Sequence, residues 1–123
     1  MNRIIVALLG VALALPAAAH HSFAVWDMSQ NIEFKGVVET LKFRNPHMAM
    51  TLTTTKPDGT KETIDFTEGA PANMLVRMGL DPAVIAPGQE ITVIGAPRKD
   101  DAHQYFIKSI VLKDGTKFQS IGP

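Results

Sequence analysis

Four histidines are the side chains best suited to metal chemistry in this sequence: His20, His21, His47 and His103. A histidine at a free amino terminus binds Cu(II) through both its α-amino nitrogen and its imidazole, and a further imidazole completes a three-nitrogen site. Imidazole suits copper, zinc and nickel, and copper binds most tightly in this series. The sequence therefore predicts a metal site built from these histidines, with copper as the expected ion.

The beginning of the chain predicts that His20 becomes an amino terminus. Arg3 is followed by an unbroken apolar run over 4–15 and then by small residues over 17–19. A basic start, an apolar stretch too short to span a bilayer and a small-residue end are typical of a secretory signal peptide. We expect residues 1–19 to be cleaved after Ala19 and the protein to reach the periplasm. Because no second long apolar run follows, we expect no membrane anchor after cleavage.

Each histidine also has an interpretation that requires no ligand. His47 follows Asn45-Pro46, so its ring could cap a backbone carbonyl in a turn. His103 lies in an acidic loop and would be an ordinary solvated residue. The pair at the mature start would be a frayed terminus. The sequence alone leaves these alternatives open.

Met48 and Met50 form a second copper-like pattern. Thioether sulfur favours Cu(I), and the two-residue spacing places both sulfurs on one face of a strand. The pattern is similar to the copper-binding strand of small periplasmic barrel chaperones, which also use a histidine and a tryptophan. Leu52 continues the same face, however, and methionine often fills irregular cores, so burial of both residues is the favoured prediction.

Composition argues against nucleic-acid binding. Without Arg3, the 12 Lys and Arg become 11 (12 − 1) against 12 Asp and Glu, which gives a mature net charge of −1 (11 − 12). A nearly neutral domain lacks the basic groove that nucleic acids require. Arg98 and Lys99 share a loop with His103, so a small anionic ligand or glycan there is an expectation to test.

No enzymatic activity is predicted. The sequence contains no nucleophile elbow, no phosphate-binding glycine loop and no zinc-protease helix motif. Strand alternation leaves most of the scattered acidic residues on a solvated face. These residues are Asp27, Glu33, Glu39, Asp65, Glu68 and Glu90.

Period-two alternation predicts the strands that would position these residues. Strands are expected over 31–43, 48–54, 63–66, 90–95, 105–112 and 117–119. A bend or bulge is expected near Gly36, where the alternation changes phase. Apolar spacing predicts a short helix between Pro71 and Gly79, and Val84 and Ile85 are candidates to plug the barrel.

The order strand-strand-strand-helix-strand-strand, with a long bent first strand, predicts an all-β fold with one short helix: a five- to six-stranded OB-type barrel. We expect this domain to span 31–123 and an N-terminal arm to span 20–30. The loops between strands one and two and between strands four and five flank the usual ligand face. His47 and His103 are therefore expected to be neighbours.

Several motifs resemble a family of small exported bacterial proteins of unknown function. They are Ala19-His20-His21-Ser22-Phe23, Asn45-Pro46-His47, Pro71-x-x-x-Leu75-x-x-x-Gly79 and Pro87-Gly88-x-x-Ile91-x-Val93-x-Gly95. The resemblance spans nearly the whole mature chain. Family members typically carry Trp-x-Phe-Glu on the third strand, where this chain has Ile64-Asp65-Phe66-Thr67. The resemblance implies a fold and an exported location, and no activity.

The sequence thus predicts a periplasmic, non-enzymatic protein that binds a small ligand, with copper held by histidines. The alternative is a structural or accessory protein that docks on another envelope protein. It would use its apolar arm over 22–26, which exposes Phe23 and Trp26 unless they fold back onto the barrel.

Overall fold

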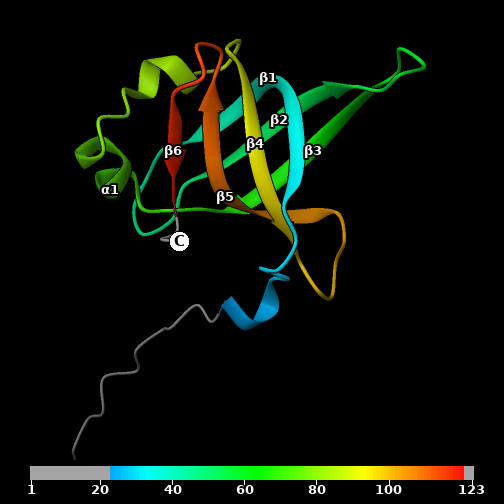
Figure 1. The fold of residues 1–123 in the computed structure, drawn as a ribbon, viewed down its shortest axis with the longest axis horizontal. Helices are drawn as coiled ribbons and strands as arrows, with labels where there is room; N and C mark the ends of the chain where they lie inside the picture. The colour runs from blue at the N-terminus through cyan, green and yellow to red at the C-terminus, as the bar shows by residue number, and fades with distance from the viewer. Residues whose placement is uncertain (1–22, 121–123) are drawn as a thin grey trace, which may run out of the picture.

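The computed structural model describes residues 23–120 (Figure 1). The predicted signal peptide, its cleavage after Ala19, and the histidines His20 and His21 lie outside these residues. The described chain begins with a short arm, residues 23–31, that leads into a mostly β domain. The start of the expected arm, residues 20–22, also lies outside the described residues.

The described elements follow the predicted order. They are η1 (Phe23–Val25), β1 (Ile32–Lys42), β2 (Ala49–Thr55), β3 (Lys61–Glu68), α1 (Ala72–Arg77), η2 (Pro82–Ile85), β4 (Glu90–Pro97), β5 (Gln104–Leu112) and β6 (Lys117–Gln119). The largest difference from prediction is the third strand, which was expected only over 63–66. It begins earlier than predicted because the tight turn after Thr55 places Lys61 directly opposite Thr55, where the two strands can already pair.

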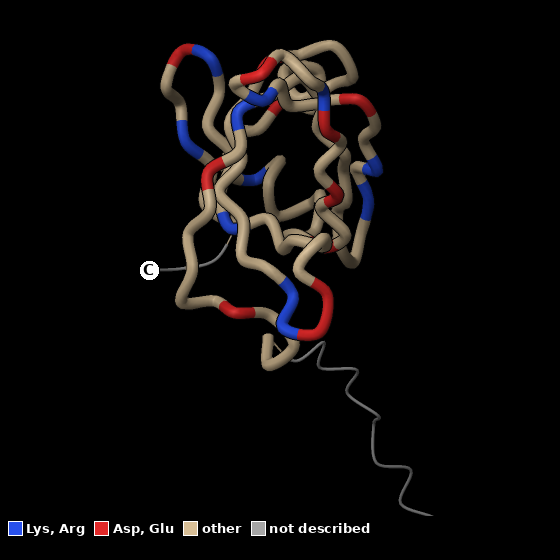
Figure 2. The backbone as a smooth tube through the Cα atoms, turned by 90° about the vertical axis from the view of Figure 1, so that its right-hand side faces the viewer, with Lys and Arg blue, Asp and Glu red and all other residues tan. Residues whose placement is uncertain are grey.

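The strands close into a barrel. Their order is β3-β2-β1-β4-β5-β6, and β3 also pairs with β5 in parallel, which joins the two sides of the five-stranded ring. We call this β3–β5 pairing the seam; it runs from Asp65, opposite Gln104, to Glu68, opposite Phe106. Figure 2 shows the backbone winding around the ring. The predicted all-β barrel with one short helix and the order β-β-β-α-β-β are confirmed.

The long first strand takes part in both halves of the barrel. Residues 32–37 of β1 pair with β4, residues 37–42 pair with β2, and the register shifts between Val38 and Thr40. Gly36 lies just before this change of partner. A Cβ atom added to it would lie 2.5 Å from the carbonyl oxygen of Thr53. The predicted bend therefore requires glycine because the neighbouring backbone leaves no room for a side chain.

Gly36→Ala is expected to lower the free energy of unfolding by about 1–3 kcal/mol, the usual cost of overpacking. Backbone cannot yield as a flexible side chain does, so β1 and β2 must shift apart. Urea denaturation of both proteins measures the difference. Lys35→Ala is the control, because Lys35 is an exposed neighbour on the same strand and its ion pair with Glu90 contributes little stability. An alanine at position 36 that costs no more than this control would contradict the prediction.

The segment between β3 and β4 covers one end of the barrel, at the left of Figure 1. Three of its side chains are buried in the main core: Leu75 of α1, Leu80 of the following link and Ile85 of η2. Ile85 therefore plugs the barrel as predicted, whereas Val84 is exposed. The helix ends as expected near Gly79, whose φ of 94 is readily adopted only by glycine.

Charged residues of both signs are interspersed along the described backbone (Figure 2). The ion pairs Lys35–Glu90 and Lys56–Glu62, at 3.7 and 3.5 Å, join exposed side chains. Such pairs contribute little stability. Among residues 23–120, no helix has the length and apolar character needed to cross a membrane.

Candidate functional site

A small pocket opens where the β1–β2 loop meets the end of β3. It has a volume of about 340 Å³ and is lined by Arg44, Asn45, Pro46, His47, Thr67 and Glu68. We call it the corner site. The loop is fixed in place by α1, since the amide of Asn73 donates to Oδ1 of Asn45 at 3.1 Å. The pocket is thus shaped by backbone that is tied to the barrel.

His47 is oriented by a backbone carbonyl. Its Nδ1 lies 3.1 Å from the oxygen of Gly69, which directly follows β3. A carbonyl oxygen only accepts, so this hydrogen bond requires the ring proton on Nδ1 and leaves Nε2 unprotonated in the neutral ring. The carbonyl contact is the turn-capping role that the sequence left open. It is also the outer contact that metal-ligating histidines usually make.

Glu68 is the residue that the sequence failed to single out. It was expected with the solvated acids, yet its side chain is only 17% exposed. One carboxylate oxygen, Oε1, lies 3.6 Å from Nδ1 of His47. The other, Oε2, accepts a hydrogen bond from Nε1 of Trp26 at 3.3 Å. Glu68 therefore lines the corner site, where it lies beside His47, and also contacts Trp26 of the arm.

The arm folds back onto the barrel through Trp26. This residue is 3% exposed and forms a small core with Ala96 and Phe106. Its ring centroid lies 5.8 Å from that of Phe106, which also contacts Phe23 edge-to-face at 5.5 Å. Of the two aromatic residues expected on an exposed arm, Trp26 is therefore buried and only Phe23, 53% exposed, faces solvent.

Polar contacts hold the rest of the arm beside the β4–β5 loop. The amide of Asp27 donates to the oxygen of Pro97 at 2.8 Å, and the amide of Lys99 donates to the oxygen of Val25 at 2.9 Å. The ammonium of Lys108 donates to the carbonyl oxygens of Met28 and Gln30 and to Oδ1 of Asn31. The arm is thus seated by backbone bonds at its start and by one lysine at its end.

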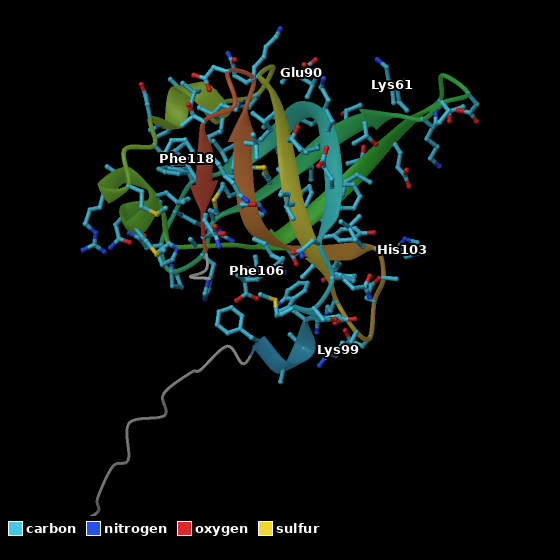
Figure 3. All side chains as sticks on the ribbon, in the orientation of Figure 1. Lys61, Glu90, Lys99, His103, Phe106 and Phe118 are labelled. Atoms are coloured by element: carbon cyan, nitrogen blue, oxygen red, sulfur yellow. The ribbon has the colours of Figure 1, made fainter. Side chains whose placement is uncertain are left out.

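His103 and His47 are not brought together. Gln104, which follows His103, pairs with Asp65 on β3, whereas His47 contacts Glu68 and the next residue. Each strand residue advances about 3.3 Å, so the three positions from Asp65 to Glu68 amount to about 10 Å. His103 is exposed, and Figure 3 shows it on the β4–β5 loop. Because β3 and β5 run parallel, the β1–β2 loop lies beyond the carboxyl end of β3, whereas the β4–β5 loop lies before the start of β5, so the expected neighbourhood of the two loops is not observed.

Arg98 and Lys99, the predicted anion-binding pair, differ in their surroundings. The guanidinium carbon of Arg98 lies 5.8 Å from the centroid of the Trp26 ring, and its Nε donates to Asp100 at 2.5 Å. This hydrogen bond raises the pKa of Arg98 and lowers the pKa of Asp100. Lys99 is exposed, near the arm in Figure 3. Arg98 thus helps to seat the arm, and its charge already has a carboxylate partner.

Met48 and Met50 belong to the core. Their side chains are 0% and 2% exposed, and both lie in the main hydrophobic cluster with Leu52 and Phe66. The favoured prediction of burial is confirmed. Because both side chains are buried, their sulfurs are not accessible from the surface, and a Cu(I) site there would need other ligands.

Within residues 23–120, no group of three or more His, Asp or Glu side chains is placed to hold a metal ion by itself. The corner site offers one imidazole, that of His47, together with the carboxylate of Glu68. Two of the four predicted ligands, His20 and His21, lie outside the described residues. A complete site at the corner would therefore need ligands from the start of the mature chain.

The fold and the corner site define a small closed β-barrel with a polar pocket beside a folded-back arm. Residues 8–106 match the family of unknown function DUF6152, so the chain belongs to that family. The match spans the arm, the corner site and the seam, and it confirms the predicted membership in a family of unknown function. No curated protein and no solved structure matches the chain.

Proposed function

We propose that this chain is an exported, non-enzymatic protein of the periplasm that binds Cu(II) at the corner site. The observation that carries the proposal is the orientation of His47. Its Nδ1 is engaged by the Gly69 carbonyl, with the Glu68 carboxylate beside it, in an open pocket. A fixed imidazole with this outer contact is the arrangement that metal-binding histidines generally show.

The remaining ligands would come from the predicted mature terminus. Phe23 packs on Phe106, and Phe106 lies opposite Glu68 across the seam. Three further residues lead from Phe23 to His20, and they can span about 10 Å at most. In this proposal, the α-amino group and ring of His20 and the ring of His21 supply the nitrogen ligands that the corner site itself lacks. With His47, these groups make the nitrogen-rich set that Cu(II) favours.

A Cu(II) titration of protein that begins at His20, with the terminus verified by mass, tests the proposal. Calorimetry gives the affinity and electron paramagnetic resonance counts the nitrogen ligands. We expect one ion per chain, and we expect His47→Ala to weaken binding by about 100-fold or more. His103→Ala is the matched control and should bind as the wild type does. One extra alanine before His20 should weaken binding while leaving His47 in place.

Two results would overturn the proposal. One is wild-type binding no tighter than that of a free peptide with the same His-His start. The other is unchanged affinity in His47→Ala. Loss of affinity in His103→Ala alone would move the ion from the corner site to the β4–β5 loop.

A second candidate is docking on another envelope protein through the arm. Phe23 and Val25 are 53% and 41% exposed, which favours this function. Burial of Trp26 reduces the apolar surface that the arm presents. A photo-crosslinker at position 23, compared with one at the exposed turn residue Asp58, would capture the partner in whole cells. Equal labelling at both positions would count against docking.

A further inference from the structure

We propose that the outer surface of β1, β2 and β3 binds a neutral oligosaccharide. The three strands lie side by side in the barrel wall, with β2 in the middle (Figure 1). Met50 and Leu52 are buried in the core, so the alternate residues of β2 point outwards. We call the outward residues within 39–42, 49–53 and 63–67 the polar face. Binding there goes beyond the proposed function and requires no metal ion.

Two hollows follow each other on this surface. One is the corner site, which includes Thr67 of β3. Asp65, two positions earlier on β3, lines the other, so the two hollows succeed each other about 7 Å along the strand. The second hollow has a volume of about 60 Å³ and is lined mainly by Thr40, Lys42, Ala49, Thr51 and Asp65.

Threonine hydroxyls continue the polar face beyond the second hollow. The Oγ1 atoms of Thr40 and Thr51 are 2.8 Å apart. Glu39 lies at the register shift of β1, and its Oε2 accepts hydrogen bonds from the hydroxyls of Thr53 and Thr63, each at 3.3 Å. A bulge of this kind re-aims a side chain. Each hydroxyl that donates still has acceptor lone pairs, so the row retains the capacity to bind a polar ligand.

The charges on the polar face favour an uncharged ligand. Lys42 and Asp65 are both exposed and lie on the two strands that flank β2. A polyanion would be repelled by Glu39 and Asp65, and a polycation by Lys42. Peptides that pair with a sheet need a free edge, whereas β2 is paired on both sides. Sugar hydroxyls donate and accept as threonine does, so a neutral oligosaccharide fits this surface best.

The polar face also sets the length and the strength of binding. Thr63 and Thr67 are four positions apart, which is about 13 Å along β3. A chain of a few sugar units covers this distance. None of the residues that make up the polar face is aromatic, so binding depends on hydrogen bonds. Because each contributes modestly, we expect a dissociation constant of about 1 mM.

Nuclear magnetic resonance titration of isotopically labelled protein with cellohexaose, a neutral and extended glucan, tests the proposal in metal-free buffer. We expect the amide signals of Thr51, Thr53 and Asp65 to shift and to saturate, whereas that of Phe118 on β6 stays unchanged. Hexagalacturonate, an anionic chain with the same number of units, should bind at least about 5-fold more weakly because of Glu39 and Asp65.

Two variants test the contacts on the polar face. Thr51→Val removes one hydroxyl but keeps the branched shape of the side chain. Loss of one hydrogen bond should weaken cellohexaose binding about 5-fold. Thr67→Val, in the corner site, should have the same effect because the chain spans both hollows. Thr92→Val is the matched control, since Thr92 lines a hollow between β1, β4 and β5, and it should bind as the wild type does.

Three results overturn the proposal. They are the absence of a saturable shift on the polar face with cellohexaose, equal affinity for hexagalacturonate, and wild-type affinity in both threonine variants. If Thr51→Val fails to fold, Thr67→Val at the end of β3 still decides the matter. Because no metal is present in these titrations, their failure leaves the copper proposal standing.

Discussion

Phe66→Ala is expected to lower the free energy of unfolding by about 3–5 kcal/mol, the usual cost of truncating a buried phenylalanine. Phe66 is fully buried on β3 and lies within the seam, opposite Tyr105. Its ring also meets Phe34 edge-to-face at 5.5 Å. Its removal leaves a cavity where β1, β3 and β5 converge. The variant should therefore weaken the β3–β5 pairing that closes the barrel.

Urea denaturation followed by far-ultraviolet circular dichroism measures this effect. Phe23→Ala is the matched control, because this phenylalanine is largely exposed and should cost less than about 1 kcal/mol, as surface substitutions usually do. Equal losses in the two variants would show that the seam is not the centre of stability.

Trp26→Ala is expected to release the arm from the barrel. Truncation of a buried tryptophan removes about 3–5 kcal/mol of packing, and here it also removes the hydrogen bond to Glu68 and the contact with Arg98. The main core does not include Trp26, so the barrel should remain folded. Exchange of the Asp27 amide should accelerate by about 100-fold or more, since each 1.4 kcal/mol corresponds to a factor of ten.

The amide of Leu52, in the middle of β2, reports on the barrel and should keep its protection in the same sample. Val25→Ala is the control for the arm, since Val25 is exposed and its backbone bond to Lys99 is retained. Loss of protection at both Leu52 and Asp27 would contradict independent opening and make the arm part of the barrel's cooperative unit.

Much of the fold could be predicted from local patterns. The alternation in β1, β2 and β3 marks strands with one buried face, and the apolar spacing after Pro71 marks the helix. Their order alone suffices for the barrel topology, because few arrangements bury all these faces at once. Burial of Met50 also followed from this reasoning, since it shares the inward face with Leu52.

The partner of His47 was also encoded, but at longer range. The turn at 57–60 places Thr55 opposite Lys61 and Met50 opposite Phe66, so paired positions sum to 116 (55 + 61, 50 + 66). Continuing this register puts position 47 opposite 69 (47 + 69 = 116), beside Glu68. The contact between His47 and Glu68 was missed because acidic residues of a strand were expected to face solvent. That expectation holds for the middle of a strand and fails at its end.

The return of the arm could not be predicted. Nothing in the local sequence before Ile32 shows that Trp26 packs on Phe106, which lies far along the chain and is presented by the seam. The separation of His47 and His103 has a similar origin. The parallel register of β3 and β5 places the two loops at opposite ends of the seam, and sequence order does not reveal that register.

The corner site consists of contacts between residues far apart in the chain, separated by 22 positions for His47 and Gly69 and by 42 for Trp26 and Glu68. Loop-closure entropy opposes such contacts until much of the chain is already ordered. We therefore expect the site to form late in folding, after the local hairpin of β2 and β3. An ion bound at the corner, as proposed, would therefore select and stabilise only the completely folded protein.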